Sequence, residues 1–203
     1  MRVYHVPNSR SFRPIWLLEE IGAPYDVTVL EPEQRQTPEH LARHPLGRVP
    51  VIEDDEGFVF ESAGICLHIA DCYPDNGFAP PPGTHDRALV YQWVFFAMTE
   101  VEAPIVDVFY HRDSESEVDK AIVEAATERF RQAAQVIENA LDGKEYLVGG
   151  RFSVADLIAA HVLSFARTVG LADGLPSIAA YLERIEARPA FERSQAVGAP
   201  APA

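Results

Sequence analysis

The first third of the chain alternates apolar and polar residues over short segments, whereas the rest repeats apolar residues at intervals of three and four. Alternation is typical of half-buried strands, and the longer interval of amphipathic helices. We therefore predict the order strand, helix, strand, helix, strand, strand, helix up to residue 73. The strands are expected at residues 2–6, 25–30, 49–53 and 58–60, and the helices at 12–21, 38–43 and from 62 onward.

The second part of the chain is predicted to be all helical. Residues 74–84 are dense in proline and glycine, which interrupt helices and strands. Beyond them, apolar spacing predicts helices at 86–110, 116–141, 154–169 and 177–187, the first of which should bend near Pro104. We therefore divide the chain into an α/β domain at 1–75, a linker at 76–84 and an all-helical domain at 85–203.

Composition and charge narrow the classes of partner. The chain has 203 residues, 47% of them hydrophobic, which is enough for a substantial core, and a net charge of -14. We expect no nucleic-acid or membrane partner, because binding to nucleic acid or to an anionic membrane needs a basic face. Lys120 and Lys144 are the only lysines, so arginine must supply any local positive site. With no membrane-length apolar segment and no signal-like N-terminus, we expect a cytoplasmic protein.

The segment from Gly47 to Ser62 contains two elements that can bind a peptide-like ligand. Val49-Pro50 opens a predicted strand, where proline cannot donate a ladder hydrogen bond and leaves neighbouring backbone groups free. Glu61-Ser62 opens a predicted helix, whose unpaired N–H groups and positive dipole end favour carboxylates. Either pair alone would suit an edge strand or an ordinary helix cap. Together, at this separation and in this order, they favour a binding site.

These residues resemble the glutathione site of the glutathione transferase superfamily. In that family the residue before a cis-proline pairs its backbone with the cysteinyl part of glutathione, and a Glu/Gln-Ser pair opening the third helix holds the γ-glutamyl carboxylate. The resemblance gives Val49 and Pro50 the first role, and Glu61 and Ser62 the second. The predicted element order is that of the family's thioredoxin-like domain, which an all-helical domain follows. The chain resembles the bacterial, serine-type members over nearly its whole length.

The resemblance implies a glutathione S-transferase, in which glutathione is the co-substrate and its thiolate attacks a small hydrophobic electrophile. No metal is expected. The resemblance also implies a homodimer, with the third helix of one subunit near the helix starting at Asp86 of the other. Glu100 or Glu102 on that helix would then reach across to the amino group of glutathione. Two further functions stay open: a non-catalytic binding or regulatory protein of the same fold, and a glutathione-dependent isomerase.

The loop at residues 7–13 holds the candidates for thiol activation. A hydroxyl hydrogen bond and a helix N-terminus both stabilise a thiolate. Aligned with the family's Pro-Gly-Ser pattern, Ser9 takes the catalytic position; aligned with the bacterial Cys-Ser pattern, Ser11 takes it and Arg10 replaces the cysteine. We favour Ser9, because Ser11 is also placed to cap the first helix. Arg10, Arg13, Arg35 and Arg48 are the candidates for a local positive pocket that attracts the anionic glutathione, and we assign Arg10 and Arg48 to the binding site. In the Pro-Gly-Ser alignment, Arg13 supports Ser9.

The electrophile pocket is expected, by resemblance, to lie against Phe12, Val106 and Tyr110. Aromatic residues on a helix more often pack into the core, so the pattern does not identify the second substrate. Tyr4 is a hydroxyl of the kind that other branches of the family use, but its place in the first strand favours a core role. No cysteine occurs in the loop, which disfavours thiol exchange.

Two further motifs are better explained by folding than by chemistry. Ser153 and Asp156 form a Ser-x-x-Asp box that is predicted to cap a buried helix through both of its residues. His40 and His44 lie four residues apart and could share a helix face. Zinc sites normally need at least three protein ligands, and no third one is evident in the sequence, so no metal site is predicted.

Overall fold

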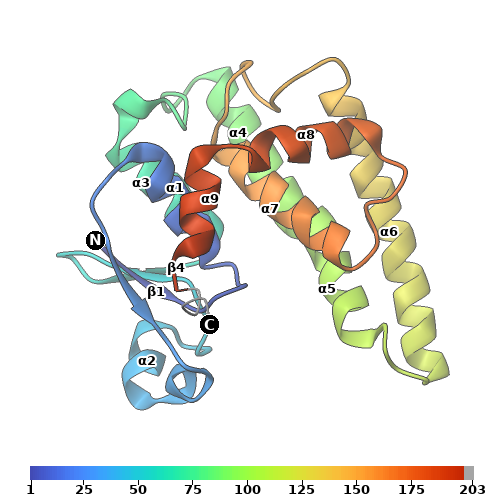
Figure 1. The fold of residues 1–203 in the computed structure, drawn as a ribbon, viewed down its shortest axis with the longest axis horizontal. Coiled ribbons are helices and arrows are strands. Elements are labelled where there is room, and N and C mark those ends of the chain that lie inside the picture. The colour runs from blue at the N-terminus through green and yellow to red at the C-terminus, as the bar shows by residue number, and fades with distance from the viewer. Residues whose placement is uncertain (199–203) are drawn as a thin grey trace. The chain divides into compact units, whose positions relative to one another are not determined.

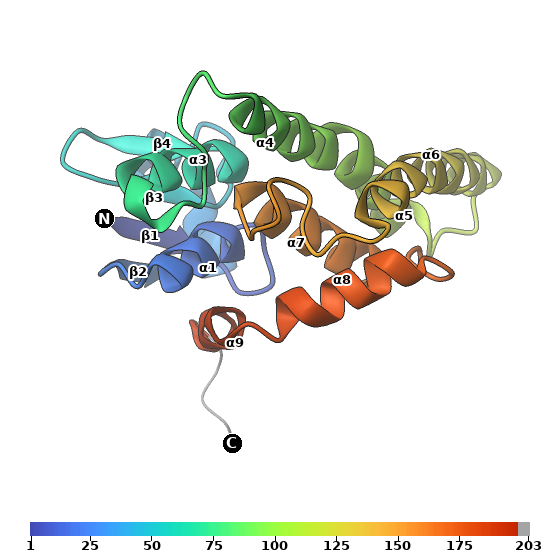
Figure 2. The same cartoon turned by 90° about the horizontal axis from the view of Figure 1, so that it is seen from above.

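The computed structural model describes residues 1–198 of the chain. These residues form two compact units, one comprising Met1–Gly77 with the segment from Glu186 onward, the other comprising Phe78–Ile185. The first unit contains a sheet covered by helices, and the second is helical throughout (Figures 1 and 2). Within the described residues, no helix combines the length and the apolar character that a bilayer span requires.

A four-stranded sheet in the order β2-β1-β3-β4 forms the centre of the first unit. β1 (Arg2–His5) pairs parallel with β2 (Asp26–Val29) and antiparallel with β3 (Val51–Glu53), and β3 pairs antiparallel with β4 (Phe58–Phe60). The predicted order of strands and helices is confirmed, and with it the thioredoxin-like fold class. The third strand starts two residues later than predicted, because Pro50 has no N–H to donate to the sheet.

Helices cover both faces of this sheet. α1 (Phe12–Ile21) and α3 (Ser62–Cys72) lie on one face, and α2 (Pro38–Arg43) lies on the other (Figure 1). Two short 3-10 helices, η1 (Pro32–Gln36) and η2 (Pro74–Asn76), were not predicted, because a single tight turn beginning at proline shows no apolar period.

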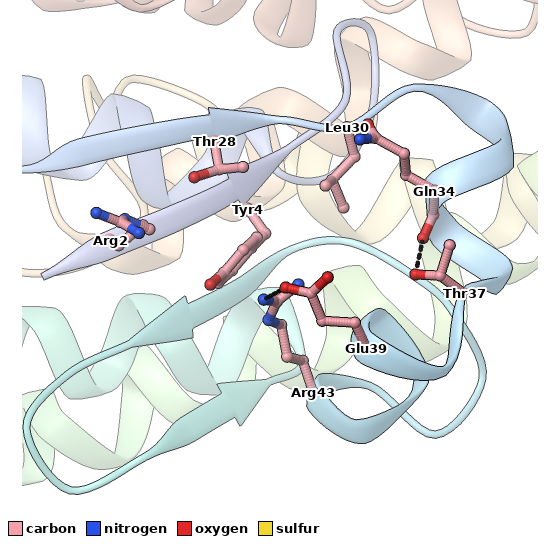
Figure 3. A pocket seen from close by; sticks show the side chains of 8 residues that line it. All are labelled: Arg2, Tyr4, Thr28, Leu30, Gln34, Thr37, Glu39 and Arg43. Carbon is pink, nitrogen blue, oxygen red and sulfur yellow. Dashed lines mark hydrogen bonds and ion pairs between the residues drawn. The ribbon is translucent and has the colours of Figure 1, made fainter.

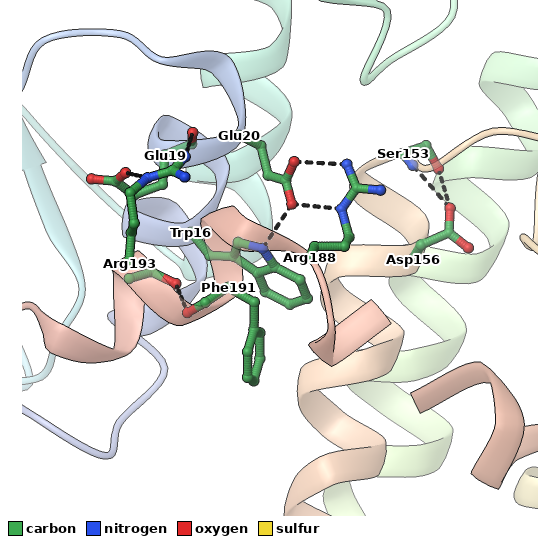
Figure 4. Close-up of polar contacts among 9 residues, drawn as sticks. Trp16, Glu19, Glu20, Ser153, Asp156, Arg188, Phe191 and Arg193 are labelled. Atoms are coloured by element: carbon green, nitrogen blue, oxygen red, sulfur yellow. Dashed lines mark hydrogen bonds and ion pairs between the residues drawn. The ribbon is translucent and has the colours of Figure 1, made fainter. Parts of the chain in front are cut away.

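A last helix, α9 (Pro189–Ala196), packs on α1 within the first unit. Arg188 donates two hydrogen bonds to the carboxylate of Glu20, at 2.6 and 2.7 Å (Figure 4). The ring of Phe191 lies edge-on to Trp16, with 5.0 Å between centroids. α9, which lies within the range 85–203 that we predicted as the helical domain, thus folds with the α/β unit through side-chain contacts between residues far apart in the sequence.

The second unit is built from long helices: α4 (His85–Phe96), α5 (Glu102–His111), α6 (Glu117–Leu141), α7 (Val154–Thr168) and α8 (Pro176–Glu186). The helix predicted at 86–110 is interrupted by a π-helical turn, η3 (Ala97–Val101). This turn ends three residues before Pro104, which lacks the N–H that would bond to the carbonyl of Glu100 within the turn. The predicted irregularity is therefore present, slightly before the proline.

The N-terminus of α7 carries the predicted capping box. The Asp156 carboxylate accepts a hydrogen bond from the Ser153 N–H at 2.9 Å and from the Ser153 hydroxyl at 3.0 Å (Figure 4), and both halves of the box are formed. Asp156 also accepts from the Leu147 N–H at 2.9 Å and from the Tyr181 hydroxyl at 3.1 Å. Burial raises the pKa of Asp156, and these hydrogen bonds act in the opposite direction. The box and its neighbours therefore serve folding.

Candidate active site

The sheet register brings three separate segments to one edge of the first unit. Tyr4, one residue before the end of β1, lies opposite Val51 at the start of β3, and Val51 also lies opposite Phe60 at the end of β4. Three segments therefore lie at the same end of the strands: the loop after β1, the Val49-Pro50 pair before β3 and the Glu61-Ser62 pair after β4. The candidate binding residues and the candidate catalytic loop thus meet through the topology of the sheet.

The Val49-Pro50 pair, just before β3, has main-chain groups that are not used in the sheet. The peptide bond between these residues is cis. Neither the N–H nor the carbonyl of Val49 is hydrogen bonded to another of residues 1–198. The Val49 side chain is half-buried and packs on the cluster around Tyr4 and Val51. A peptide-like ligand can therefore pair with the Val49 main chain, whose position is fixed by its side chain.

The turn before Val49 is held in place from the α2 side. The buried His40 side chain is hydrogen bonded through Nε2 to the Arg48 carbonyl at 3.0 Å. Gly47 has φ +61, and a Cβ there would lie 2.5 Å from the Arg35 carbonyl, so only glycine fits. Nδ1 of His44 accepts the Leu46 N–H at 3.1 Å. Both histidines thus shape this turn.

At the start of α3, a backbone of unusual conformation exposes the helix end. Glu61 has φ 75 and ψ 105, which is uncommon for a residue with a side chain, and α3 has no side-chain cap. Ser62, which is 3% exposed, accepts a hydrogen bond at its hydroxyl from Nη1 of Arg13 at 3.0 Å. The Ser62 proton and the first N–H groups of the helix can then face an anion.

Arg13, which the sequence indicated as a candidate for local positive charge and as a support for Ser9, is hydrogen bonded to Ser62 instead. It is fully buried at 0% exposure, yet it belongs to the apolar face of α1. A buried guanidinium beside Ser62 places positive charge directly behind the start of α3. The position of Arg13 on the apolar face of a predicted helix could have indicated this role. An arginine on such a face becomes buried, and arginine is almost never fully buried without a specific polar partner. Arg10 and Arg48, the predicted positive residues, are both exposed on the surface.

In the loop after β1, the two serines have different surroundings. Ser11 is fully buried, and its hydroxyl lies within 3.1 Å of the Val6 N–H and within 2.9 Å of Nδ1 of His5. Ser9 is half-buried, and its hydroxyl lies 2.7 Å from the Val6 carbonyl and 2.7 Å from the Ser11 hydroxyl. Ser11 does not cap α1 with its side chain. Ser9 is therefore the serine whose hydroxyl can also reach a ligand.

Comparison with known proteins adds an independent observation. The glutathione S-transferase N-terminal domain family matches residues 1–71, and the corresponding C-terminal domain family matches residues 86–189. The chain belongs to the glutathione S-transferase family. The predicted family, two-part fold and enzyme class are thereby confirmed.

Three proteins illustrate the similarity. Glutathione S-transferase F11 of Arabidopsis thaliana is 32% identical, and the match covers 81% of this chain and 81% of the relative. A solved structure of a sphingomonad glutathione S-transferase complexed with glutathione has 29% identity and a TM-score of 0.84, and covers 96% of this chain and 97% of that one. Elongation factor 1-gamma of Prunus avium is 29% identical over 87% of this chain but only 42% of its own length.

In this glutathione S-transferase, the Tyr4 side chain makes its contacts away from the candidate site. It lines a cavity of about 260 Å³ between the sheet and α2 (Figure 3). Its hydroxyl donates to the Glu53 carboxylate at 2.6 Å, and the Arg43 guanidinium lies 4.3 Å from its ring centroid. Burial and the bond to Glu53 raise the pKa of Tyr4. The predicted core role of Tyr4 agrees with these contacts, and the cavity contains none of the predicted site residues.

The predicted electrophile-site residues belong to different units. Phe12 is half-buried in the first unit, where its ring lies 5.3 Å from the ring of Phe191. Val106 and Tyr110 lie on α5 in the second unit, and Tyr110 is 74% exposed. Their common role in a pocket stays a prediction. Of the two acidic residues considered for contact with glutathione, Glu102 is buried in its own unit, whereas Glu100 is exposed.

Proposed function

We propose that this glutathione S-transferase binds glutathione at the sheet edge of its first unit and activates the thiol through Ser9. The observation that carries the proposal is the convergence of three groups: the free Val49 peptide, the Ser62 hydroxyl backed by Arg13, and the half-buried Ser9 hydroxyl. Each of these groups suits a different part of glutathione. The sphingomonad relative whose structure contains glutathione supports the same ligand.

Binding would use two kinds of interaction. The N–H and carbonyl of Val49 pair with the cysteinyl part as a strand pairs with its neighbour. The γ-glutamyl carboxylate lies at the start of α3, where Ser62 donates its proton and the helix N–H groups add to the attraction. The exposed Arg10 and Arg48 would draw an anionic ligand toward a protein whose net charge is -14.

Thiol activation would come from hydrogen bonding and not from a base. A free thiol has a pKa of about 8.5, so only a few per cent is ionised at neutral pH. Lowering that pKa by about two units corresponds to about 2.7 kcal/mol of selective stabilisation of the thiolate. A hydrogen bond from Ser9 together with the nearby start of α1 supplies stabilisation of this kind. The thiol proton leaves to solvent, and the thiolate forms a bond to the electrophile as its leaving group departs.

The test of this assignment is the ultraviolet absorbance of the bound thiolate as a function of pH. We expect wild-type protein to show a thiolate at neutral pH and Ser9→Ala to lose it. Ser11→Ala is the matched control and should keep more of the signal, because Ser11 is buried behind Ser9. A larger loss in Ser11→Ala than in Ser9→Ala would contradict the assignment to Ser9.

The electrophile is proposed only as a small hydrophobic molecule, and the family resemblance is the ground for testing Tyr110 of α5 as a residue that contacts it. A panel of electrophiles that includes aryl halides, epoxides and activated alkenes would identify the class. Substitution of Tyr110 by Ala should change the order of preference within the panel and leave glutathione affinity unchanged. An unchanged order would remove Tyr110 from the site.

A non-catalytic role is the second candidate function, and the match to a relative that is named as an elongation factor, and not as a transferase, supports it. Titration with glutathione separates the two functions: absence of binding in the millimolar range, which corresponds to about -4 kcal/mol, would leave only the non-catalytic function. Binding with thiolate formation but without transfer to any electrophile would favour a glutathione-dependent isomerase.

We also propose a homodimer in the cytoplasm. In the first unit, Phe58 and Phe60 of β4 are 44% and 40% exposed. In the second unit, Tyr91 and Phe95 of α4 are 38% and 59% exposed. Exposed aromatic residues of this kind are typical of protein interfaces. Sedimentation should give a dimer that Phe95→Glu converts to a monomer, and a wild-type monomer at micromolar concentration would contradict the proposal.

A further inference from the structure

One histidine contacts both segments that carry the proposed glutathione-binding groups. His44, directly after the last residue of α2, is 5% exposed. Its Nδ1 accepts the N–H of Leu46 at 3.1 Å, in the turn before Val49. The centroid of the same ring lies 4.7 Å from that of Phe60, which is the last residue of β4 and two positions before Ser62. His44 therefore joins the turn before Val49 to the segment before Ser62.

The turn before Val49 depends on hydrogen bonds more than on burial of its own large side chains. Leu46 is 62% exposed, and Arg48 is also exposed. Two of the hydrogen bonds in this turn are accepted by His44: its Nδ1 accepts the Leu46 N–H, and its carbonyl accepts the Gly47 N–H at 2.9 Å. Loss of the bond to the ring would therefore loosen the turn that leads directly into the Val49 main chain.

The hydrogen bond from Leu46 fixes the protonation state of the ring. A main-chain N–H can only donate, so Nδ1 of His44 must accept and carries no proton. The neutral ring therefore has its proton on Nε2. If the ring takes up a second proton, the N–H groups of His44 and Leu46 point at each other with no acceptor between them. The ring must then leave this position, and its contact with Phe60 changes as well.

The surroundings of the ring favour its neutral form. Burial is the largest influence and lowers the pKa of His44. The Glu61 carboxylate just before α3 and the carbonyl of His44 itself act in the opposite direction, whereas His40 and Arg48 lower the pKa further, and the net shift is downward. The stability that the neutral ring contributes is therefore present above the ordinary histidine pKa of about 6.5 and is lost as the pH falls through the lowered value.

We propose that His44 is a positioning residue for glutathione binding, whose neutral ring holds the Val49 main chain and the start of α3 at the spacing that the ligand requires. The inference rests on the proposed function, in which Val49 and Ser62 bind two different parts of glutathione. In this role His44 does not contact the ligand and takes no part in the transfer step. Uptake of a proton by the ring releases the turn, so glutathione affinity should fall in mildly acidic solution.

The test measures binding of S-methylglutathione, whose sulfur cannot ionise, by calorimetry at pH 7 and pH 5. In wild-type protein we expect the affinity to fall about fivefold between these two values. His44→Asn keeps an acceptor for the Leu46 N–H, because an asparagine side chain can accept from the N–H two residues later, and it does not titrate. It should bind within about twofold of wild type at pH 7 and lose most of the pH dependence.

His44→Phe keeps a ring against Phe60 but has no acceptor for the Leu46 N–H. We expect it to bind S-methylglutathione about fivefold more weakly than wild type at pH 7, with little further loss at pH 5. His68→Asn is the matched control, because His68 is an exposed histidine of the same unit, on α3. Its affinity at each pH should equal that of wild type.

The outcomes separate this inference from the function on which it rests. Wild-type protein that binds neither glutathione nor S-methylglutathione at pH 7 would refute the proposed function. Wild-type affinity that does not change with pH, or a His44→Asn variant that keeps the wild-type pH dependence, would overturn only the role of His44. So would wild-type affinity in folded His44→Phe at pH 7. Should His44→Phe fail to fold, the comparison of wild type with His44→Asn still decides, since equal pH dependence in the two proteins would overturn the proposal.

Discussion

The N-termini of α7 and α3 each have a serine and a nearby acidic residue, and the two helix ends have different roles. At the start of α7, Ser153 and Asp156 close on each other, and the carboxylate is surrounded by donors from its own unit. At the start of α3, Glu61 makes no side-chain cap, and Ser62 bonds to Arg13 instead of to its own helix. The start of α7 is therefore capped by its own residues, whereas the start of α3 has groups that can still bind a ligand.

The difference arises from the order of the serine and the acidic residue along the chain, and from the group that packs beneath them. Asp156 is three residues after Ser153, so its carboxylate can turn back to the start of the helix. Glu61 precedes Ser62, and its φ of 75 directs the chain away from a capping geometry. A serine and an acidic residue at a helix start can therefore form a cap or a binding site. Which of the two they form depends on their order in the sequence and on the side chains that pack beneath them.

The largest expected effect is at the closed end. Asp156→Ala removes one acceptor from the Leu147 N–H, the Ser153 N–H and hydroxyl, and the Tyr181 hydroxyl, all of them buried. We expect a loss of about 3–5 kcal/mol in the free energy of unfolding, measured by urea denaturation. The folded fraction should bind glutathione with wild-type affinity. A loss below about 1 kcal/mol would show that the box is not the structural element described.

The sharpest contrast comes from the same substitution at the two serines. Ser62→Ala removes a donor to the ligand carboxylate, and we expect about 2 kcal/mol weaker glutathione binding by calorimetry, or roughly thirtyfold. Because Arg13 also loses an acceptor, unfolding should become about 1 kcal/mol easier.

Ser153→Ala is the matched control for Ser62→Ala. It should also lower the free energy of unfolding by about 1 kcal/mol, through loss of a helix cap, and leave glutathione affinity unchanged. Equal affinities in the two variants would remove Ser62 from the binding site. An unchanged melting temperature in Ser153→Ala would remove the capping assignment.

The smallest effect concerns the backbone at the open end. Glu61 has φ 75, a region that costs a residue with a side chain about 1 kcal/mol or more. Glu61→Gly should therefore stabilise the fold by about 0.5–1 kcal/mol in urea denaturation, because glycine adopts positive φ without that cost. Glu61→Ala keeps the cost and serves as the control. A destabilised Glu61→Gly would mean that the side chain, and not the backbone, maintains this turn.

Several features of the fold and the site could be predicted because they depend on nearby residues. The strand after Pro50 and the capping box at Ser153 each follow from residues within three or four positions. The helix start at Ser62 is marked by the change of apolar period. The interruption near Pro104 was also expected, since one missing N–H disturbs the turn before it.

The choice between Ser9 and Ser11 could not be made in the same way. Both serines lie in one loop with similar neighbours in sequence, and only the packing of that loop buries Ser11 while leaving Ser9 half-buried. The packing of α9 on α1 joins residues that lie 168 positions apart, as in the pair Arg188 and Glu20. No local pattern contains such a partner.

The order of strands and helices, the positions of Val49-Pro50 just before a strand and of Glu61-Ser62 at the start of a helix, and the family of the chain could all be predicted from the amino-acid sequence. The pairing of Arg13 with Ser62, 49 residues away, and the position of Ser11 between His5 and Ser9 could be recognised only in the folded chain. Periodicity and turn chemistry act over a few residues. The partners of a buried polar group are set by sheet register and by the packing of helices, which sequence spacing does not record.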